Sequence, residues 1–169
     1  ASLTCYSDAV TAVLRKPLVS TSGSLSSFSN CEGTAATEQS FTVTGQYLTN
    51  DLTVTAPTGF EVSATSGSGY QSSITLTPTD GSVSATVYVQ IPSTTSSGSP
   101  SGDITCASVH NLGGNPTSAS ATVPASGTVT AAPTVSGTGA TICGTGTAGL
   151  TATASAGTIN WYAAASGGA

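Results

Sequence analysis

Charge is the scarcest property of this chain. Asp, Glu, Lys and Arg make up 5% of its 169 residues, against about 25% in typical soluble domains. Arg15 and Lys16 are the only basic residues, and the formal net charge is −5. A chain this poor in cations offers no surface for the phosphates of a nucleic acid or of anionic lipid. We therefore expect no nucleic-acid partner and, because no apolar run approaches the ~20 residues of a membrane span, no direct membrane insertion.

Residues that carry chemistry are also few. His110 is the only histidine, and none of the four cysteines stands in a Cys-x-x-Cys pair, so a zinc site has almost no ligands. No Gly-x-Ser-x-Gly turn links a serine to His110, which we expect to be a solvated residue of a Gly/Asn/Pro-rich loop. The seven carboxylates lack the spacing of an acid–base pair. We predict no catalytic residue, no enzyme and no cofactor.

A metal site has equally little support in the sequence. Calcium needs several carboxylate and carbonyl oxygens together, and the sequence has no run of closely spaced aspartates. Asp51, Asp80 and Asp103 could each supply a single ligand from a turn or a strand end. The pair Asp80-Gly81 is more typical of a hairpin turn. We predict no metal site.

Methionine is absent, even at position 1, and no signal peptide is visible at Ala1. We expect a piece of a longer, exported protein whose signal lies upstream. Residues 130–169 favour the same interpretation. Their patterns predict about three strands, at 134–136, 150–154 and 158–163, where a sandwich needs about seven.

Serine and threonine, by contrast, are abundant, at 59 of the 169 residues, and glycine adds 20. Such a composition also occurs in disordered, mucin-like stalks. Here, however, apolar residues reach 37% and alternate with Ser and Thr over about five to eight residues at a time, as in half-buried strands. The pattern favours a folded all-β protein.

One complete domain is predicted between about Leu18 and Val129. Turn signals separate its strands at intervals of about 8–12 residues, which is typical of an all-β sandwich. The predicted strands lie at 23–29, 39–45, 51–56, 60–65, 73–78, 84–91, 102–108 and 118–129. The predicted core consists of Phe28, Phe41, Val43, Leu52, Val54, Phe60, Val62, Ile74, Leu76, Val87, Val89, Ile91 and Ile104.

We therefore expect an all-β fold class, with Ig-like antiparallel β-sandwich domains in tandem. Residues 1–19 form the terminal strands of a preceding domain in this interpretation. Residues 20–129 form the complete sandwich, and residues 130–169 form the first strands of a following domain.

The cysteines extend this interpretation. Cys31 lies just before the second predicted strand and Cys106 inside the penultimate one. In Ig-like sandwiches those strands lie in opposite sheets, so we predict a Cys31–Cys106 disulfide, worth roughly 4 kcal/mol in the chain-entropy model. The alternative is a pair of reduced, buried thiols. Cys5 and Cys143 are left over, and we expect each to pair beyond these 169 residues; disulfides favour an extracellular location.

The block CGTGTAGLTATASAGTINWYAAASGGA, from Cys143 onward, resembles the Ig-like repeats of very large surface proteins of gliding bacteria that are exported by the type IX secretion route. The segments FSNCEGTAATEQSFTVTG, LTVTAPTGFEVSATSGSGYQSSITLTP and VYVQIPSTTSSGSPSGDITC resemble a second repeat type that often neighbours the first. Residues 1–19 then resemble the end of a preceding copy of the first type. The resemblance implies adhesion and gliding motility through filaments on the bacterial cell surface, with neighbouring repeats as partners. It carries over no catalytic or ligand-binding residue.

Two other functions stay open. In a pilus-like filament, residues 1–20 of one subunit add as a strand to the incomplete domain at 130–169 of the next, and Cys5 could pair with Cys143 between subunits. The chain could also be the spacer region of a secreted polysaccharide-active enzyme.

Surface glycans are a further candidate partner. The most solvent-facing predicted loops, 65–72, 93–101 and 111–117, are where we expect ligand contact or attached sugar. Trp161 and Tyr162 could stack on sugar, although a core tryptophan packed against its domain's disulfide is the role we expect.

Overall fold

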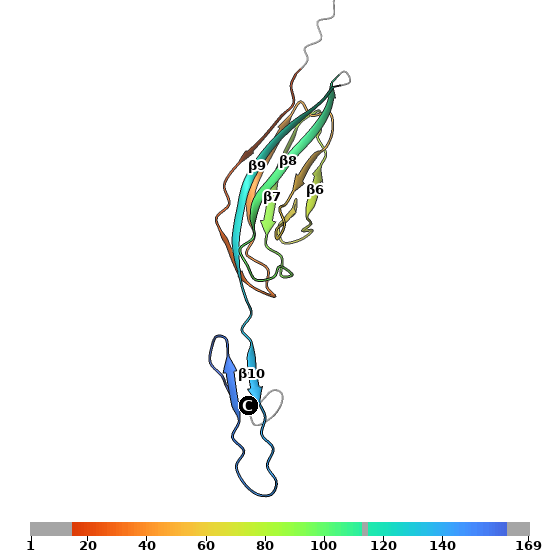
Figure 1. Ribbon diagram of the computed structural model, residues 1–169. Helices are drawn as coiled ribbons and strands as arrows, with labels where there is room; N and C mark the ends of the chain where they lie inside the picture. Colours follow the sequence, from red (N-terminus) through yellow and green to blue (C-terminus); the bar gives the residue numbers. More distant parts are fainter. Residues whose placement is uncertain (1–14, 113–114, 162–169) are drawn as a thin grey trace, which may run out of the picture.

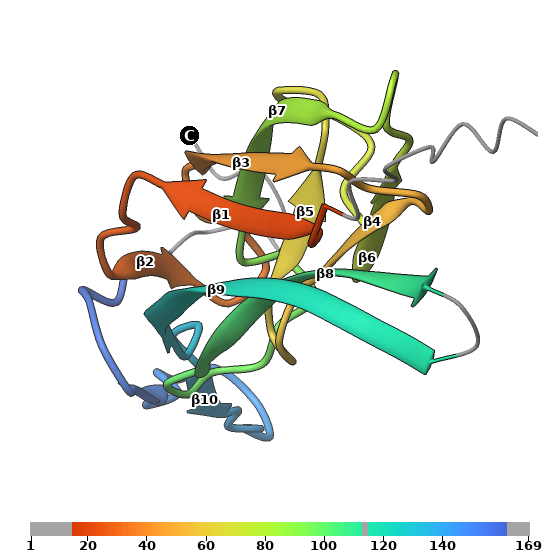
Figure 2. The same cartoon turned by 90° about the horizontal axis from the view of Figure 1, so that it is seen from above.

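The computed structural model describes residues 15–112 and 115–161, and these residues form an all-β structure without helix, as predicted. Nine strands form two facing sheets (Figure 2), and two further strands form a separate hairpin. The strands are β1 (Leu18–Ser22), β2 (Phe28–Cys31), β3 (Gln39–Gln46), β4 (Leu52–Thr55), β5 (Glu61–Ser63), β6 (Ser73–Leu76), β7 (Val83–Gln90), β8 (Ser101–Leu112), β9 (Asn115–Thr130), β10 (Val135–Thr138) and β11 (Thr151–Ala154).

The two sheets enclose one hydrophobic core. One sheet has the strand order β1-β3-β7-β5 and the other β2-β9-β8-β4-β6. Neighbouring strands pair antiparallel, except that β2 and β9 run parallel. Along β4, buried Leu52 and Val54 alternate with exposed Thr53 and Thr55. Because strand side chains point to opposite faces in turn, this alternation gives an apolar interior and a hydroxyl-rich exterior.

The predicted core is confirmed at every position but Ile74. Ile74 is only partly buried, because β6 lies at the edge of its sheet. Within the core, Phe28 and Phe60 meet edge to face, with ring centroids 5.6 Å apart. The structure adds core residues that the sequence analysis did not select: Val19, Ala36, Leu48, Cys106, Ala119, Val123, Ala125 and Val129.

The predicted strand at 23–29 is wrong. The chain forms β1 before it and β2 at its end, and the two strands belong to different sheets. Gly23 has φ +95°, which suits glycine best. It follows β1, which pairs with β3, at the point where the chain crosses to the other sheet to form β2 beside β9. Strand β1 begins at Leu18.

Strands β8 and β9 are longer than predicted. They pair continuously from Ser101 opposite Ser126 to Leu112 opposite Asn115. The composition of residues 111–117 is typical of a loop, yet strand pairing reaches Pro116, whose lack of an N–H costs little near a hairpin end. The predicted loop at 111–117 is therefore largely strand.

The hairpin predicted at Asp80-Gly81 is confirmed. Thr79 and Ser82 exchange two backbone hydrogen bonds of 2.9 Å. Asp80 and Gly81 have φ of +50° and +71°, as a type I′ turn requires.

The strand order differs from the Ig-like arrangement at one point. After β4, the chain first forms β5, which pairs with β7, and then β6, which pairs with β4. If β4 takes the place of strand C and β7 that of strand E, an immunoglobulin domain forms the edge strand beside C before the edge strand beside E. The order in this chain is the reverse. A tandem Ig-like organisation is thus not confirmed, and the predicted domain boundaries stay predictions.

The chain enters and leaves the sandwich at opposite ends (Figure 1). Lys16, Pro17 and Leu18 lie against Ser118–Ser120, near the start of β9. The chain leaves after Thr130, the last residue of β9, about 35 Å further along that strand. The β10–β11 hairpin follows beyond this end.

Candidate functional site

His110 is fully buried, at 0% exposure, on the inward face of β8. Its Nδ1 accepts the backbone N–H of Thr49 at 3.1 Å and lies 2.9 Å from the Thr49 hydroxyl. This hydrogen bonding assigns the ring proton to Nε2, which has no partner among the described residues. The prediction of a solvated loop histidine is wrong, since β8 continues four residues past the predicted strand and turns His110 inward.

The surroundings of His110 fix a turn and form no relay for catalysis. Ser108 donates its hydroxyl to the carbonyl of Asn50 at 3.1 Å, and the Asn50 side chain donates to the carbonyl of Val109. These bonds hold the turn between β3 and β4 on β8. In the described part of the chain, no carboxylate orients His110, and the only hydroxyl it contacts is that of Thr49. A nucleophile–base–carboxylate relay needs both partners in place.

The predicted Cys31–Cys106 disulfide is wrong for this structure, in which both thiols are free. Cys31 pairs with Thr130 at the end of β9. Cys106 pairs with Ala121 on the same strand, so β9 separates the two cysteines within one sheet. These two partners are nine positions apart, which corresponds to about 30 Å along β9, and a disulfide needs Cα atoms within about 7 Å. The prediction placed β2 and β8 in opposite sheets.

The thiols have unlike environments. Cys106 is buried, and this burial raises the pKa of its thiol to about 11, so it stays protonated and is a weak nucleophile. Cys31 and Cys143 are exposed and free. Cys5 lies outside the described residues, and the pairing of Cys5 and Cys143 with cysteines elsewhere stays a prediction.

Glu38 joins two distant loops. Its carboxylate accepts hydrogen bonds from the hydroxyls of Ser66 and Tyr70 and from the backbone N–H of Gly67, the last at 2.9 Å. The bonds from Ser66, Tyr70 and Gly67 lower the pKa of Glu38 below its ordinary value of 4.5. Burial, together with the bond to Glu38, raises the pKa of Tyr70 to about 12. Hydrogen bonds to the Glu38 carboxylate therefore hold the predicted contact loop at 65–72 in place.

The second predicted contact loop, at 93–101, is also fixed. Gly98 exchanges two backbone hydrogen bonds with Val129, of 2.8 and 2.9 Å. Pro100 packs so closely on Gly59 that a Cβ there would lie 2.7 Å from the proline ring. The loop thus closes the end of the sandwich from which the chain leaves.

The three aspartates named as single calcium ligands are not brought together. Over residues 15–112 and 115–161, no group of three or more His, Cys, Asp or Glu side chains is placed to hold a metal ion. Asp80 is accounted for by its turn. Asp103 lies near the start of β8, opposite Pro124.

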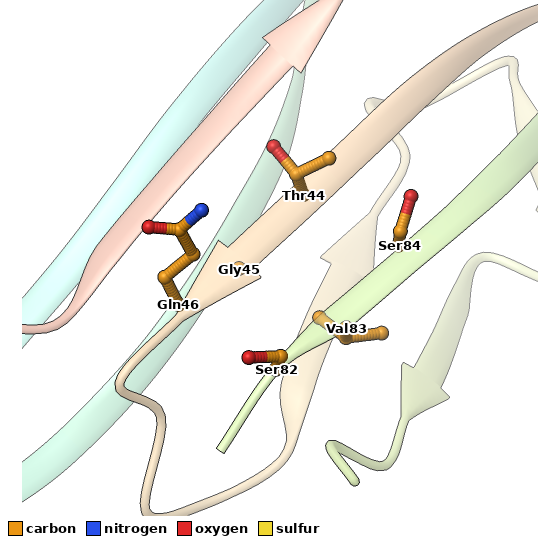
Figure 3. Close-up of a pocket in the computed structure, with 6 residues that line it drawn as sticks. All are labelled: Thr44, Gly45, Gln46, Ser82, Val83 and Ser84. Atoms are coloured by element: carbon orange, nitrogen blue, oxygen red, sulfur yellow. The ribbon is translucent and has the colours of Figure 1, made fainter. Parts of the chain in front are cut away.

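A shallow hollow of about 240 Å³ lies over the ends of β3 and β7 (Figure 3). It is lined by Thr44, Gly45, Gln46, Ser82, Val83 and Ser84. These side chains offer hydroxyl and amide groups and no ionisable group. The hollow therefore cannot supply acid–base chemistry.

A second, apolar hollow of about 290 Å³ lies on the β10–β11 hairpin and includes Val135, Leu150 and Trp161 in its lining. Trp161 is 59% exposed, so the expected packing of this side chain in a core with a disulfide is not found. Residues 158–161 of the predicted third strand are not strand, and 162–163 lie outside the described residues, as does Tyr162.

Protein-family models, curated proteins and solved structures all give no match to this chain. Within the described ranges there is no helix long and apolar enough to cross a membrane.

Two polar contacts that fix loops, Thr49 with His110 and Glu38 with Tyr70, were not predicted from the sequence. A signal for His110 was present. Ile104, Cys106, Ser108 and His110 recur at every second position, and a strand at this period points all four to one face. No comparable signal marks Glu38, because its partners lie about thirty positions away.

Proposed function

We propose that this chain is a structural and adhesive segment of a filamentous bacterial cell-surface adhesin, built of Ig-like sandwiches in series and used in surface attachment or gliding. Its location is extracellular, on the outer membrane or on a secreted filament. Its partners are neighbouring repeats, and surface glycans at the hydroxyl-rich faces. It has no catalytic role.

The arrangement of the terminal strands carries this proposal. The chain enters at one end of the sandwich and leaves at the other, and β2 runs parallel to β9. Tension on the two chain ends pulls β1 and β2 toward their own starts and β9 toward its own end. These strands must then slide along their neighbours, so their hydrogen bonds resist together. This is the geometry expected of a domain that transmits tension along a filament.

The outer surface supports adhesion by many weak contacts. The outward positions of β3, β4 and β7 are mostly Ser and Thr. Neutral hydroxyl groups bind polar ligands weakly, and repetition along a filament multiplies such contacts into avidity.

Pulling single molecules in two directions tests the tension-bearing role. Handles attached at Lys16 and Ala131 apply the force at the two points where the chain enters and leaves the sandwich. Handles on Gln46 and Ser82 load adjacent ends of β3 and β7, which pair antiparallel, so those strands separate one pair at a time. We expect a clearly higher unfolding force in the first direction. An equal or lower force there contradicts the proposal.

A second candidate, the strand-donating filament subunit, is favoured by the β10–β11 hairpin. An isolated two-stranded hairpin is marginal in water, and this one exposes Val135, Leu150 and Trp161. Light scattering of the purified chain over a range of concentrations tests it. Polymers that dissolve when Val135 and Leu150 are both replaced by Lys support strand donation, whereas a monomer at all concentrations excludes it.

A further inference from the structure

Tyr47 has an unusual backbone conformation for a bulky residue. It follows β3 with φ +57°, in the left-handed region that side chains with a Cβ rarely occupy. The turn requires this φ, because Leu48 folds back into the core and donates its N–H to the carbonyl of Gly81 at 2.9 Å. Glycine would adopt the conformation at lower cost. The ring of Tyr47, which is 43% exposed, therefore needs an explanation of its own.

Arg15 supplies that explanation. Its Nη1 donates to the hydroxyl of Tyr47 at 2.7 Å. Its guanidinium carbon lies 4.9 Å from the centre of the ring, within the range of a cation–π interaction. The two residues are 32 positions apart in the sequence, so the contact ties the incoming chain to the β3–β4 turn.

The residues that follow Arg15 are also held. Pro17 is buried, and its ring fixes φ. Leu18 pairs with Gln46, directly before Tyr47. The chain is thus anchored on both sides of Lys16.

We propose that Arg15 and Tyr47 form a clasp that fixes the chain where it enters the sandwich, and so sets the direction from which the preceding segment arrives. The clasp rests on the geometry of described residues and does not depend on the proposed function. In a chain under tension, it makes this joint stiff, where an unheld Lys16-Pro17 linker would swivel.

The sequence provides a direct assay for this clasp. Arg15 and Lys16 are the only Lys or Arg residues, and the bond from Lys16 to Pro17 resists trypsin because proline follows it. The Arg15–Lys16 bond is therefore the single bond that trypsin can cut. Cleavage requires the Arg15 side chain to leave Tyr47 and enter the protease's acidic specificity pocket. When opening is fast relative to cleavage, the rate reports the population of the open clasp.

We expect Tyr47→Gly to raise the rate of this cleavage by about fivefold or more, since the ring and hydroxyl contacts are both lost. Its urea midpoint should stay equal or rise, because glycine relieves the left-handed φ. Tyr47→Phe keeps the ring and loses the hydroxyl, and should give an intermediate rate. Asp80→Gly is the matched control: it relieves the other non-glycine residue with positive φ, at +50°, and should be cut at the wild-type rate.

Equal cleavage rates for the wild type, Tyr47→Gly and Tyr47→Phe would overturn the clasp. If Tyr47→Gly does not fold, Tyr47→Phe decides alone, and a wild-type rate for it overturns the proposal. A faster rate for Asp80→Gly, with an unchanged urea midpoint, would also overturn it, because strain relief and not the clasp would then control cleavage.

Discussion

Thr49 donates its backbone N–H to Nδ1 of His110 at 3.1 Å, across 61 positions of the sequence. The bond lies where the turn after β3 meets the far half of the β8–β9 hairpin. The only histidine of the chain provides the acceptor for this backbone N–H, and its own ring is fully buried. The structure thus assigns His110 a structural role, in place of the solvated loop position that the sequence suggested.

Replacement of His110 tests this role. His110→Leu keeps the volume approximately and removes the acceptor of the Thr49 N–H, and should lower the free energy of unfolding by about 0.5–1.5 kcal/mol, the net contribution of a hydrogen bond. His110→Gln retains a side-chain acceptor and should cost less. Urea denaturation measures both. Val109→Thr, at the exposed neighbouring position, is the control, and a His110→Leu protein as stable as the wild type contradicts the assignment.

Acid should loosen the loop held by Glu38. Since the pKa of Glu38 is lower in the folded chain than its ordinary value of 4.5, its contribution to stability is present above that value. It is lost as pH falls through the folded pKa. The shift of the Gly67 amide resonance with pH follows the loop directly.

Glu38→Gln should abolish this acid-dependent change, because the amide does not titrate in this range. Glu61→Gln is the matched control, since the Glu61 side chain makes none of these bonds. A Gly67 resonance that changes identically with pH in the wild type and in Glu38→Gln would show that another group causes the effect.

Gly45 should not tolerate a side chain. A Cβ there would lie 2.5 Å from Cδ1 of Leu48 and 2.9 Å from Cγ1 of Val83. Gly45→Ala should therefore cost about 1–3 kcal/mol through overpacking. Gly139→Ala, which would meet nothing within 4 Å, is the control and should be close to neutral. Thermal melts of the two variants give the comparison, and equal melting temperatures would contradict the packing described.

The cysteines should react in a fixed order. A thiol-alkylating reagent should label exposed Cys31 and Cys143 in the native protein, and Cys106 only after unfolding, because Cys106 is buried and its pKa is about 11. Peptide mass spectrometry identifies the labelled sites. Adding a reductant should leave the melting temperature unchanged. A clear drop would show that the protein contains a disulfide, contrary to the free thiols of Cys31 and Cys106.

Local patterns were sufficient for several of the elements. The alternation of Val, Ile and Leu with Ser and Thr predicted β4, β6 and β7 close to their observed bounds, and all but one of the core residues named from it are buried, although the structure adds eight more. Such alternation depends only on each strand's own residues, because successive side chains point to opposite faces. The turn at Asp80-Gly81 was predictable for the same reason, since its positive φ values are a property of those two residues.

Pairing between strands was decided by the tertiary structure. The sequence alone determined an all-β chain with an apolar interior, a hydroxyl-rich exterior and almost no charge. Only the fold decided that β2 lies in the same sheet as β8, which separates Cys31 from Cys106, and that β8 continues far enough to bury His110. Strand neighbours and register depend on contacts between residues far apart in the chain, and many partners satisfy the same local pattern. The core that forms when both sheets close selects one of them.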